Sequence, residues 1–280
     1  MIKKIPVYIR LMRPLNLFQG GIAVLVTGTL MDHFPNWVTI LFAIGIVWSF
    51  TGAGNALNDY CDAEIDRVNR PKRPIPQGLI SRKAALVFAI GLFVFGSLLA
   101  WPILSPELSV IVGVALVMLI SYSLYFKVRP FFGNLMVSLI LGMAFLFAAT
   151  VFGDIRKGVP PFFLAFGFNL IREIVKDIQD MEGDKAVNAR TIPLSIGIPP
   201  TRMLIFFLTV ILMVGALIPY FFNIYGIFYL LVLIFTVEIP LVYFLYSISR
   251  DSSAENCGRL SSLLKADIFF GLLAIFLGRY

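Results

Sequence analysis

Acidic and amide side chains recur at helical spacing where a long apolar run ends, in the segment NDYCDAEID. Asn58, Asp62 and Asp66 are four residues apart, and Asp59 precedes Asp62 by three, so a helix would place all four side chains on one face. Carboxylates this close repel one another unless a cation lies among them. Mg²⁺ is the natural cation, because proteins commonly hold it with one or two carboxylates and the phosphates of a substrate. The segment therefore predicts a site for Mg²⁺ and a phosphorylated ligand.

A second acidic segment, REIVKDIQDMEGD, ends another apolar run at residues 172–184. Glu173, Asp177, Asp180 and Asp184 follow one stripe of a helix. One acidic helix end is commonly a solvated surface, which is the alternative for either segment alone. Two such ends on the same side of a membrane favour a shared binding site. We therefore predict that Asp177, Asp180 and Asp184 are metal ligands together with the first set.

A basic loop, RVNRPKRPIPQG, directly follows the first acidic segment. Pro71, Pro74 and Pro76 stiffen this loop and stop the helix from continuing. Arginine binds phosphate oxygens with two parallel hydrogen bonds, whereas lysine adds a mobile charge. The loop therefore predicts a diphosphate-binding element, whose basic residues are Arg67, Arg70, Lys72 and Arg73.

The composition excludes a soluble protein. The 280 residues are 59% hydrophobic and 14% charged, whereas a soluble domain carries about 25% charged residues. We predict an all-α integral membrane protein, a bundle of nine transmembrane helices in one domain, residues 1–280. The expected spans are 15–31, 36–57, 84–101, 108–126, 131–152, 159–176, 203–222, 225–247 and 262–278.

The basic residues predict the orientation. With a cytoplasmic N-terminus, 20 of the 23 Lys and Arg residues fall on the cytoplasmic side, all except Arg156, Lys157 and Arg279. The C-terminus is then outside, and both acidic segments face the cytoplasm. The first helix is expected to be retained, because no small-residue cleavage site follows it. The net charge of +7 reflects this bias rather than a nucleic-acid partner.

Four motifs together resemble the UbiA superfamily of intramembrane prenyltransferases: N-D-x-x-D-x-x-x-D, R-P-x-R-P-I-P-x-G, S-Y-x-L-Y-x-K and K-D-I-x-D-x-x-G-D. The resemblance covers the whole chain. It implies transfer of a prenyl group from its diphosphate, with two Mg²⁺ ions held by the two acidic segments. It also implies that Lys127 contacts the diphosphate, although a lysine at a membrane boundary can equally be placed there by its charge alone. Tyr122 and Tyr125 are candidates for stabilising an allylic cation through their rings.

Within the superfamily, the second acidic segment is most similar to an archaeal group of enzymes that make ether lipids. Those enzymes move a geranylgeranyl group to the free hydroxyl of geranylgeranylglyceryl phosphate. The implied partners are a prenyl diphosphate and a lipid-phosphate acceptor from the membrane, without nucleic acid or an obligate protein partner. An aromatic-acid polyprenyltransferase of quinone biosynthesis remains the alternative. The acceptor phosphate needs a second anion site, and its unranked candidates are Arg13, Asn16, Arg129, Arg172 and Arg190.

Overall fold

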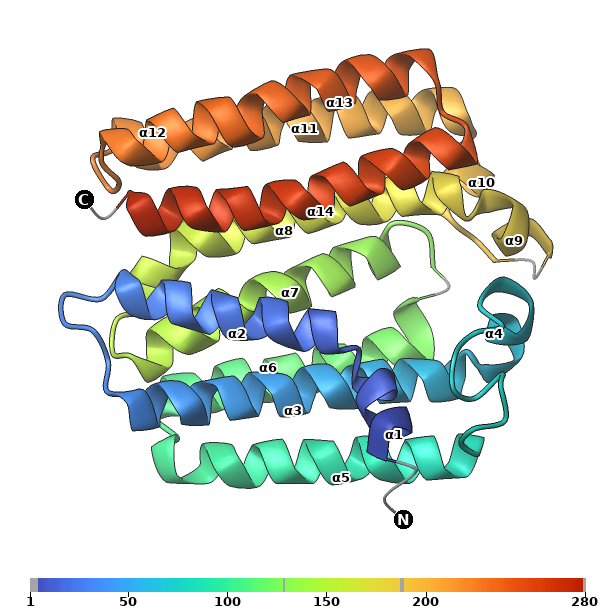
Figure 1. Ribbon diagram of the computed structural model, residues 1–280, viewed down its shortest axis with the longest axis horizontal. Helices are drawn as coiled ribbons and strands as arrows, with labels where there is room; N and C mark the ends of the chain where they lie inside the picture. Colours follow the sequence, from blue (N-terminus) through green and yellow to red (C-terminus); the bar gives the residue numbers. More distant parts are fainter. Residues whose placement is uncertain (1–4, 128, 187–188, 279–280) are drawn as a thin grey trace. The chain divides into compact units, whose positions relative to one another are not determined.

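The structure, a computed structural model, describes residues 5–127, 129–186 and 189–278, and the regular elements in these ranges are all helical (Figure 1). The chain divides into two compact units, the first formed by Met1–Tyr125 with Ala144–Arg156 and the second by Phe126–Met143 with Lys157–Tyr280. Eight helices in the described part are long and apolar enough to cross a membrane. The chain is therefore a multi-pass membrane protein. Lys3, Lys4 and Arg279, which contributed to the predicted orientation, lie outside the described residues.

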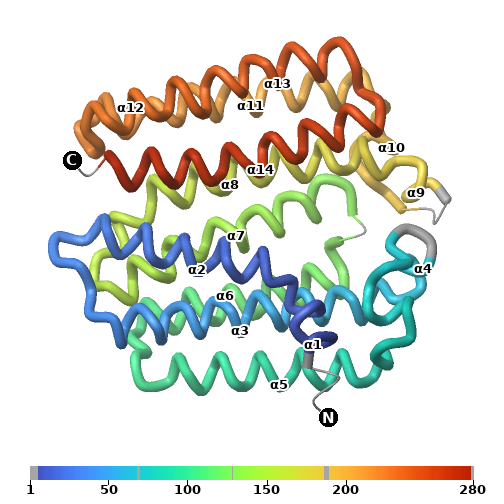
Figure 2. The backbone as a smooth tube through the Cα atoms, viewed as in Figure 1, coloured from blue at the N-terminus to red at the C-terminus, as the bar shows by residue number. Residues whose placement is uncertain are grey.

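The first unit is built around one long buried helix, Trp37–Cys61, which packs along the helix Arg82–Ala100 (Figure 2). Its elements are α1 (Ile5–Met12), α2 (Pro14–Thr29), α3 (Trp37–Cys61), α4 (Ala63–Asn69), α5 (Arg82–Ala100), η2 (Trp101–Ile103) and α6 (Pro106–Ser121). Three further elements contain residues of both units: η3 (Tyr122–Phe126), α7 (Phe132–Val151) and η4 (Ile155–Gly158).

The first predicted span, 15–31, coincides with helix α2, which is short for a helix that crosses a membrane. Helix α2 has 16 residues, which is about 24 Å at 1.5 Å per residue and less than the roughly 30 Å of a bilayer core. It is bounded by Arg13, whose backbone is left-handed at φ 57°, and by a turn at Leu30. The prediction of nine spans therefore exceeds by one the eight spanning helices of the described residues. The other eight predicted spans each coincide with one of these helices.

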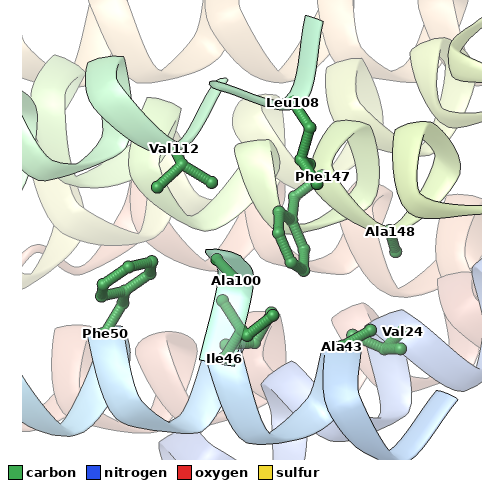
Figure 3. Close-up of a cluster of buried hydrophobic side chains, with 10 residues drawn as sticks. Val24, Ala43, Ile46, Phe50, Ala100, Leu108, Val112, Phe147 and Ala148 are labelled. Carbon is green, nitrogen blue, oxygen red and sulfur yellow. The ribbon is translucent and has the colours of Figure 1, made fainter. Parts of the chain in front are cut away.

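The core of the first unit joins α2, α3, α5, α6 and the end of α7. Figure 3 shows Ile46 and Phe50 of α3 facing Phe147 of α7, with Ala100 and Val112 beside them. Gly54 allows α6 to approach α3 closely, since a Cβ there would lie 2.8 Å from Cδ2 of Leu119. This packing fixes the end of α3 that carries the first acidic segment.

Side-chain caps start the helices where the sequence changes from polar to apolar. Asn36, Ser81, Ser105 and Ser253 each accept a hydrogen bond from the backbone N–H three residues further on. These caps satisfy N–H groups that a helix start leaves without a partner. The cap at Ser253 also explains why the last helix begins eight residues before the predicted span, because its first two turns are polar.

The second unit contains α8 and α14, which lie side by side (Figure 2), together with the helices on α14. Its complete elements are α8 (Val159–Gln179), α9 (Met181–Ala186), α10 (Ile192–Ile196), α11 (Ile198–Phe221), α12 (Ile227–Leu233), η5 (Ile234–Glu238), α13 (Ile239–Arg250) and α14 (Ala254–Leu277). Helix α8 carries the second acidic segment at its end, and α14 packs along it.

Large apolar side chains cover the outside of the spanning helices. Trp37 is 64% exposed at the start of α3, and Trp101 is 76% exposed just after α5. Phe222, which caps α11, is 73% exposed. Such contiguous apolar surface is unfavourable in water and is expected of helices that face lipid.

Candidate active site

The first acidic segment is divided between two helices. Helix α3 ends at Cys61 and α4 begins at Ala63, with Asp62 between them at φ −86° and ψ 4°. The backbone ladder nevertheless continues, because Asp62 N–H donates to the Asn58 carbonyl and Asp66 N–H to the Asp62 carbonyl. The expected four-residue spacing on one face is therefore kept across the break.

Three aspartates of this segment converge on one guanidinium. The Nη1 atom of Arg73 lies 2.5 Å from Asp66 Oδ2, 3.2 Å from Asp59 Oδ1 and 3.9 Å from Asp62 Oδ2. The three aspartates are between 3% and 7% exposed. Burial raises the pKa of Asp66, against the effect of Arg73, and its two acidic neighbours raise it further. A cation is thus what holds this buried cluster together.

Helix α1 holds the basic loop in place. Arg10 donates from Nη2 to the Lys72 carbonyl at 2.9 Å and to Gln77 Oε1 at 3.2 Å. Leu11 is fully buried and packs with Ile80 at the end of the loop. Turns within the loop are closed by backbone hydrogen bonds, among them one from the Gln77 N–H to the Arg73 carbonyl. The loop is therefore ordered, as its prolines predict.

Arg13 also contacts the cluster, through Asp59. Its Nη2 donates to Asp59 Oδ1 at 2.7 Å, and Asn55 donates from Nδ2 to the carbonyl of Met12 at 2.9 Å. The junction between α1 and α2 is thereby fixed against the end of α3. The sequence analysis proposed Arg13 as a candidate for binding the acceptor phosphate. In the structure it instead contacts Asp59, one of the candidate metal ligands.

The amide of Asn58 is oriented by a neighbouring helix. Ser123, buried in η3, donates from Oγ to Asn58 Oδ1 at 2.9 Å. Ser123 lies within the S-Y-x-L-Y-x-K motif, where the sequence analysis singled out only the two tyrosines and Lys127. A serine inside an otherwise apolar and aromatic stretch was the available signal.

The second acidic segment repeats the construction of the first. Helix α8 ends at Gln179 and α9 begins at Met181, with Asp180 between them at φ −91° and ψ 3°. Asp180 N–H donates to the Lys176 carbonyl, and Asp184 N–H to the Asp180 carbonyl. Each unit therefore carries an aspartate at a helix break in the same backbone conformation, one often adopted by active-site residues.

Asn134 of α7 orients the first aspartate of this segment. Its Nδ2 donates to Asp177 Oδ2 at 2.9 Å, and Asn134 is 9% exposed. Metal-binding carboxylates are commonly oriented by such outer hydrogen bonds. Sequence reasoning did not identify Asn134, although an asparagine in the apolar helix FGNLMVSLIL is a recognisable signal.

Glu173 does not join these aspartates as a candidate ligand. It accepts hydrogen bonds from Arg172 Nη1 at 2.9 Å and from Lys176 Nζ at 2.9 and 3.0 Å. The Nε atom of Arg172 is buried and has no hydrogen-bond partner among the described residues. Arg172 therefore has donor capacity that Glu173 does not use.

The other predicted site residues differ in exposure. Arg67 pairs with Glu64 at 2.9 Å, and both side chains are about two-thirds exposed. Arg129 lies over the Phe126 ring at 5.7 Å, and Tyr125 is 64% exposed. Among the remaining candidates, the side chains of Lys72 and Arg190 are exposed, and those of Asn16, Tyr122 and Lys127 are half-buried. Arg70 caps the end of α4.

The carboxylate oxygens of the first acidic segment are of the kind that binds Mg²⁺. In the described part of the chain, no group of three acidic, histidine or cysteine side chains is arranged so that it could hold a metal ion without further ligands. Asp59, Asp62 and Asp66 offer hard oxygen ligands that already surround one cationic group, the Arg73 guanidinium. A divalent ion would compete with Arg73 for the same oxygens.

Two carboxyl groups in the spanning helices lie outside the predicted site. Glu238 Oε1 and Asp267 Oδ2 are both buried without a hydrogen-bond partner in the described ranges. Glu238 ends η5, a π-helical segment between α12 and α13. The sequence analysis did not consider Asp267.

Comparison with known proteins finds a family that spans both units. Residues 22–266 match the UbiA prenyltransferase family. The chain is 36% identical to the digeranylgeranylglyceryl phosphate synthase of Methanosphaera stadtmanae, with 97% of this chain and 98% of the relative covered. It is 35% identical to the enzyme of that name from Methanothermobacter thermautotrophicus, over 97% of this chain and 95% of the relative.

Solved structures have the same fold. A structure of digeranylgeranylglyceryl phosphate synthase is 28% identical, covers 99% of both chains and superposes with a TM-score of 0.83. A UbiA homologue from Archaeoglobus fulgidus, bound to GPP and Mg²⁺, is 17% identical over 96% of this chain and 99% of that one, with a TM-score of 0.68.

Proposed function

Because the chain belongs to the UbiA prenyltransferase family, we propose that it transfers a geranylgeranyl group from geranylgeranyl diphosphate to the free hydroxyl of geranylgeranylglyceryl phosphate. The product is digeranylgeranylglyceryl phosphate. The observation that carries the proposal is the similarity of about 35% identity along nearly the full length to archaeal synthases of that product.

In this reaction the bond between prenyl C1 and the diphosphate oxygen breaks, and an ether bond forms between C1 and the acceptor oxygen. The diphosphate leaves, and the acceptor hydroxyl loses its proton. An allylic C1 is prone to ionise once the leaving group is neutralised. The chain must therefore bind the diphosphate charge and exclude water from C1.

Two groups of residues would hold magnesium. We assign Asn58, Asp59, Asp62 and Asp66 to one ion and Asp177, Asp180 and Asp184 to a second. When bound, the ions stabilise the negative charge of the leaving diphosphate, an effect worth several kcal/mol. The support is the repeated construction in which Asp62 and Asp180 each occupy a helix break in the same conformation.

The basic loop binds the diphosphate in this proposal. Arg73 lies among the three aspartates and is 23% exposed, so it is placed to exchange carboxylate partners for phosphate oxygens. Arg70, Lys72, Arg67 and Lys127 are the further candidates. Tyr122 and Tyr125, next to Ser123, are candidates for ring contacts with the allylic cation.

The two units act as one prenyltransferase domain, with both acidic segments on the cytoplasmic face. The family match, which extends through both units, supports the single domain, and the partition of the basic residues supports the cytoplasmic face. The N-terminus is then cytoplasmic and the C-terminus outside, which requires an odd number of crossings. Helix α2, too short to cross unaided, supplies the ninth crossing together with the flanking turn.

A direct assay tests the proposal. Purified protein is incubated with Mg²⁺, geranylgeranyl diphosphate and either geranylgeranylglyceryl phosphate or 4-hydroxybenzoate, and products are identified by mass spectrometry. Formation of the doubly prenylated glycerol phosphate is expected. Prenylation of the aromatic acid alone would replace the proposal with the quinone-precursor alternative.

A further inference from the structure

A cluster of basic side chains in the second unit has too few acidic partners. Glu173 accepts hydrogen bonds from Arg172 and Lys176, and Lys127 is close enough for its charge to act on Glu173. The buried Nε of Arg172 remains without a partner in the described part of the chain. Glu173 thus faces three cations from two segments, and Asp177, a second carboxylate that acts on Lys176, accepts a hydrogen bond from Asn134.

A further cation comes from α14. Lys265 is half-buried, and the charged groups that act on it are Arg172 and Lys176, both positive. No ion pair of Lys265 with an acidic residue occurs in the described ranges. Like charges at a partly buried position are unfavourable unless enough anionic groups lie among them, and Glu173 is already shared by Arg172, Lys176 and Lys127.

The packing of α8 against α14 places these residues at one level. A Cβ on Gly258 would lie 3.1 Å from Gln179 Nε2, and one on Gly271 would lie 4.0 Å from Phe168 Cε2. Because the later glycine of α14 meets the earlier residue of α8, the two helices are in contact and antiparallel. Arg172 lies seven residues before Gln179 and Lys265 seven residues after Gly258, about 10 Å along each helix.

We propose that Arg172, Lys176 and Lys265 bind a phosphate monoester, and that this is the phosphate of the lipid acceptor. The assignment to the acceptor rests on the proposed function. The position supports it, since Arg172 precedes the proposed metal ligands Asp177 and Asp180 by five and eight residues, about 8 and 12 Å of helix rise. An anion here and a diphosphate at the aspartates can be held at the same time.

The geometry also ranks the acceptor-side candidates. Arg13 is engaged with Asp59, and Arg129 and Arg190 are exposed. Arg172 differs from these arginines in having a buried N–H group that has no partner in the described part of the chain. An ordered phosphate oxygen is the kind of acceptor that such a donor binds.

Kinetics on the purified full chain in detergent test the proposal. Lys265→Gln is expected to raise the KM for geranylgeranylglyceryl phosphate about ten-fold or more and the KM for geranylgeranyl diphosphate less than two-fold. Arg259→Gln is the matched control on the same helix, because Arg259 is 74% exposed and pairs with Glu255. It should change neither constant.

Binding without turnover gives an independent readout. Geranylgeranylglyceryl phosphate alone, without metal, should raise the melting temperature of the wild type and of Arg259→Gln, whereas uncharged geranylgeranylglycerol should raise it less. The rise with the phosphate should be lost in Lys265→Gln and restored in Lys265→Arg. If Lys265→Gln does not fold, Lys176→Gln is measured in the same way.

Three results would overturn the proposal. A rise in the KM for prenyl diphosphate alone would assign the cluster to the leaving group, and unchanged constants with an unchanged melting shift would show that it binds neither. Equal stabilisation by the phosphate and by the uncharged lipid would show that the cluster does not recognise the phosphate. A wild type that prenylates only an aromatic acid would instead reject the proposed function.

Discussion

Nη2 of Arg13 lies 2.7 Å from Oδ1 of Asp59, which joins the turn before α2 to the buried end of α3. Asp59 is 3% exposed, and Arg73 lies 3.2 Å from the same oxygen. Two arginines, 60 positions apart in the sequence, therefore neutralise one buried carboxylate. In the absence of metal, these arginines are what compensates its charge.

We expect Arg13→Gln to destabilise the metal-free protein more than the metal-bound one. The loss of one partner of a buried charge costs about 1–3 kcal/mol, and a divalent ion at the same oxygens would replace that partner. The melting temperature should therefore fall in EDTA and recover with Mg²⁺ by more than in the wild type. Lys83→Gln, an exposed change in the same unit, is the control. An equal Mg²⁺ effect in both variants would contradict the prediction.

Asp62→Ala and Asp180→Ala should each lower turnover by about a hundred-fold or more at saturating Mg²⁺, because each removes a proposed metal ligand at a helix break. Both variants should remain folded, since neither side chain contributes to the apolar core. Glu64→Ala is the matched control, because Glu64 is 66% exposed and only two residues from Asp62. Near-normal turnover in either aspartate variant would exclude a site that needs both segments.

Asn134→Ala should raise the Mg²⁺ concentration for half-maximal activity about ten-fold, as expected when the hydrogen bond that orients a metal-binding carboxylate is lost. Asn169→Ala is matched to it, because Asn169 is also buried in the second unit but donates to a carbonyl of its own helix. A titration of activity against Mg²⁺ distinguishes the two variants. The idea fails if both curves shift equally.

Single cysteines test the orientation. In a background that lacks Cys61 and Cys257, Lys72→Cys and Asp184→Cys should react with a membrane-impermeant thiol reagent only from the cytoplasmic side. Asn36→Cys should react only from outside. Reaction of the first two from opposite faces would show that the acidic segments do not share a site.

Periodicity predicted the helices well because apolar spans are a strong signal. It placed α2 within two residues but counted it as a full span, although the turns at Arg13 and Leu30 leave it only 16 residues. The spacing of Asn58, Asp62 and Asp66 predicted their common face, which survives the break at Asp62 because the backbone hydrogen bonds continue through it.

Partners between distant segments could not be predicted from one sequence. The contacts of Ser123 with Asn58 and of Asn134 with Asp177 join residues 65 and 43 positions apart. The like-charged surroundings of Lys265 depend on how α14 packs on α8. Spacing within one helix carries no information about such pairs.

The positions of the tryptophans determine what intrinsic fluorescence can report. All three tryptophans belong to the first unit: Trp37, Trp48 and Trp101. Each is at least 41% exposed, on the apolar surface of that unit. Brominated lipids should therefore quench the emission efficiently. Emission will report the solvation of the first unit, whereas unfolding of the second unit needs another probe, such as a tryptophan placed at Phe222.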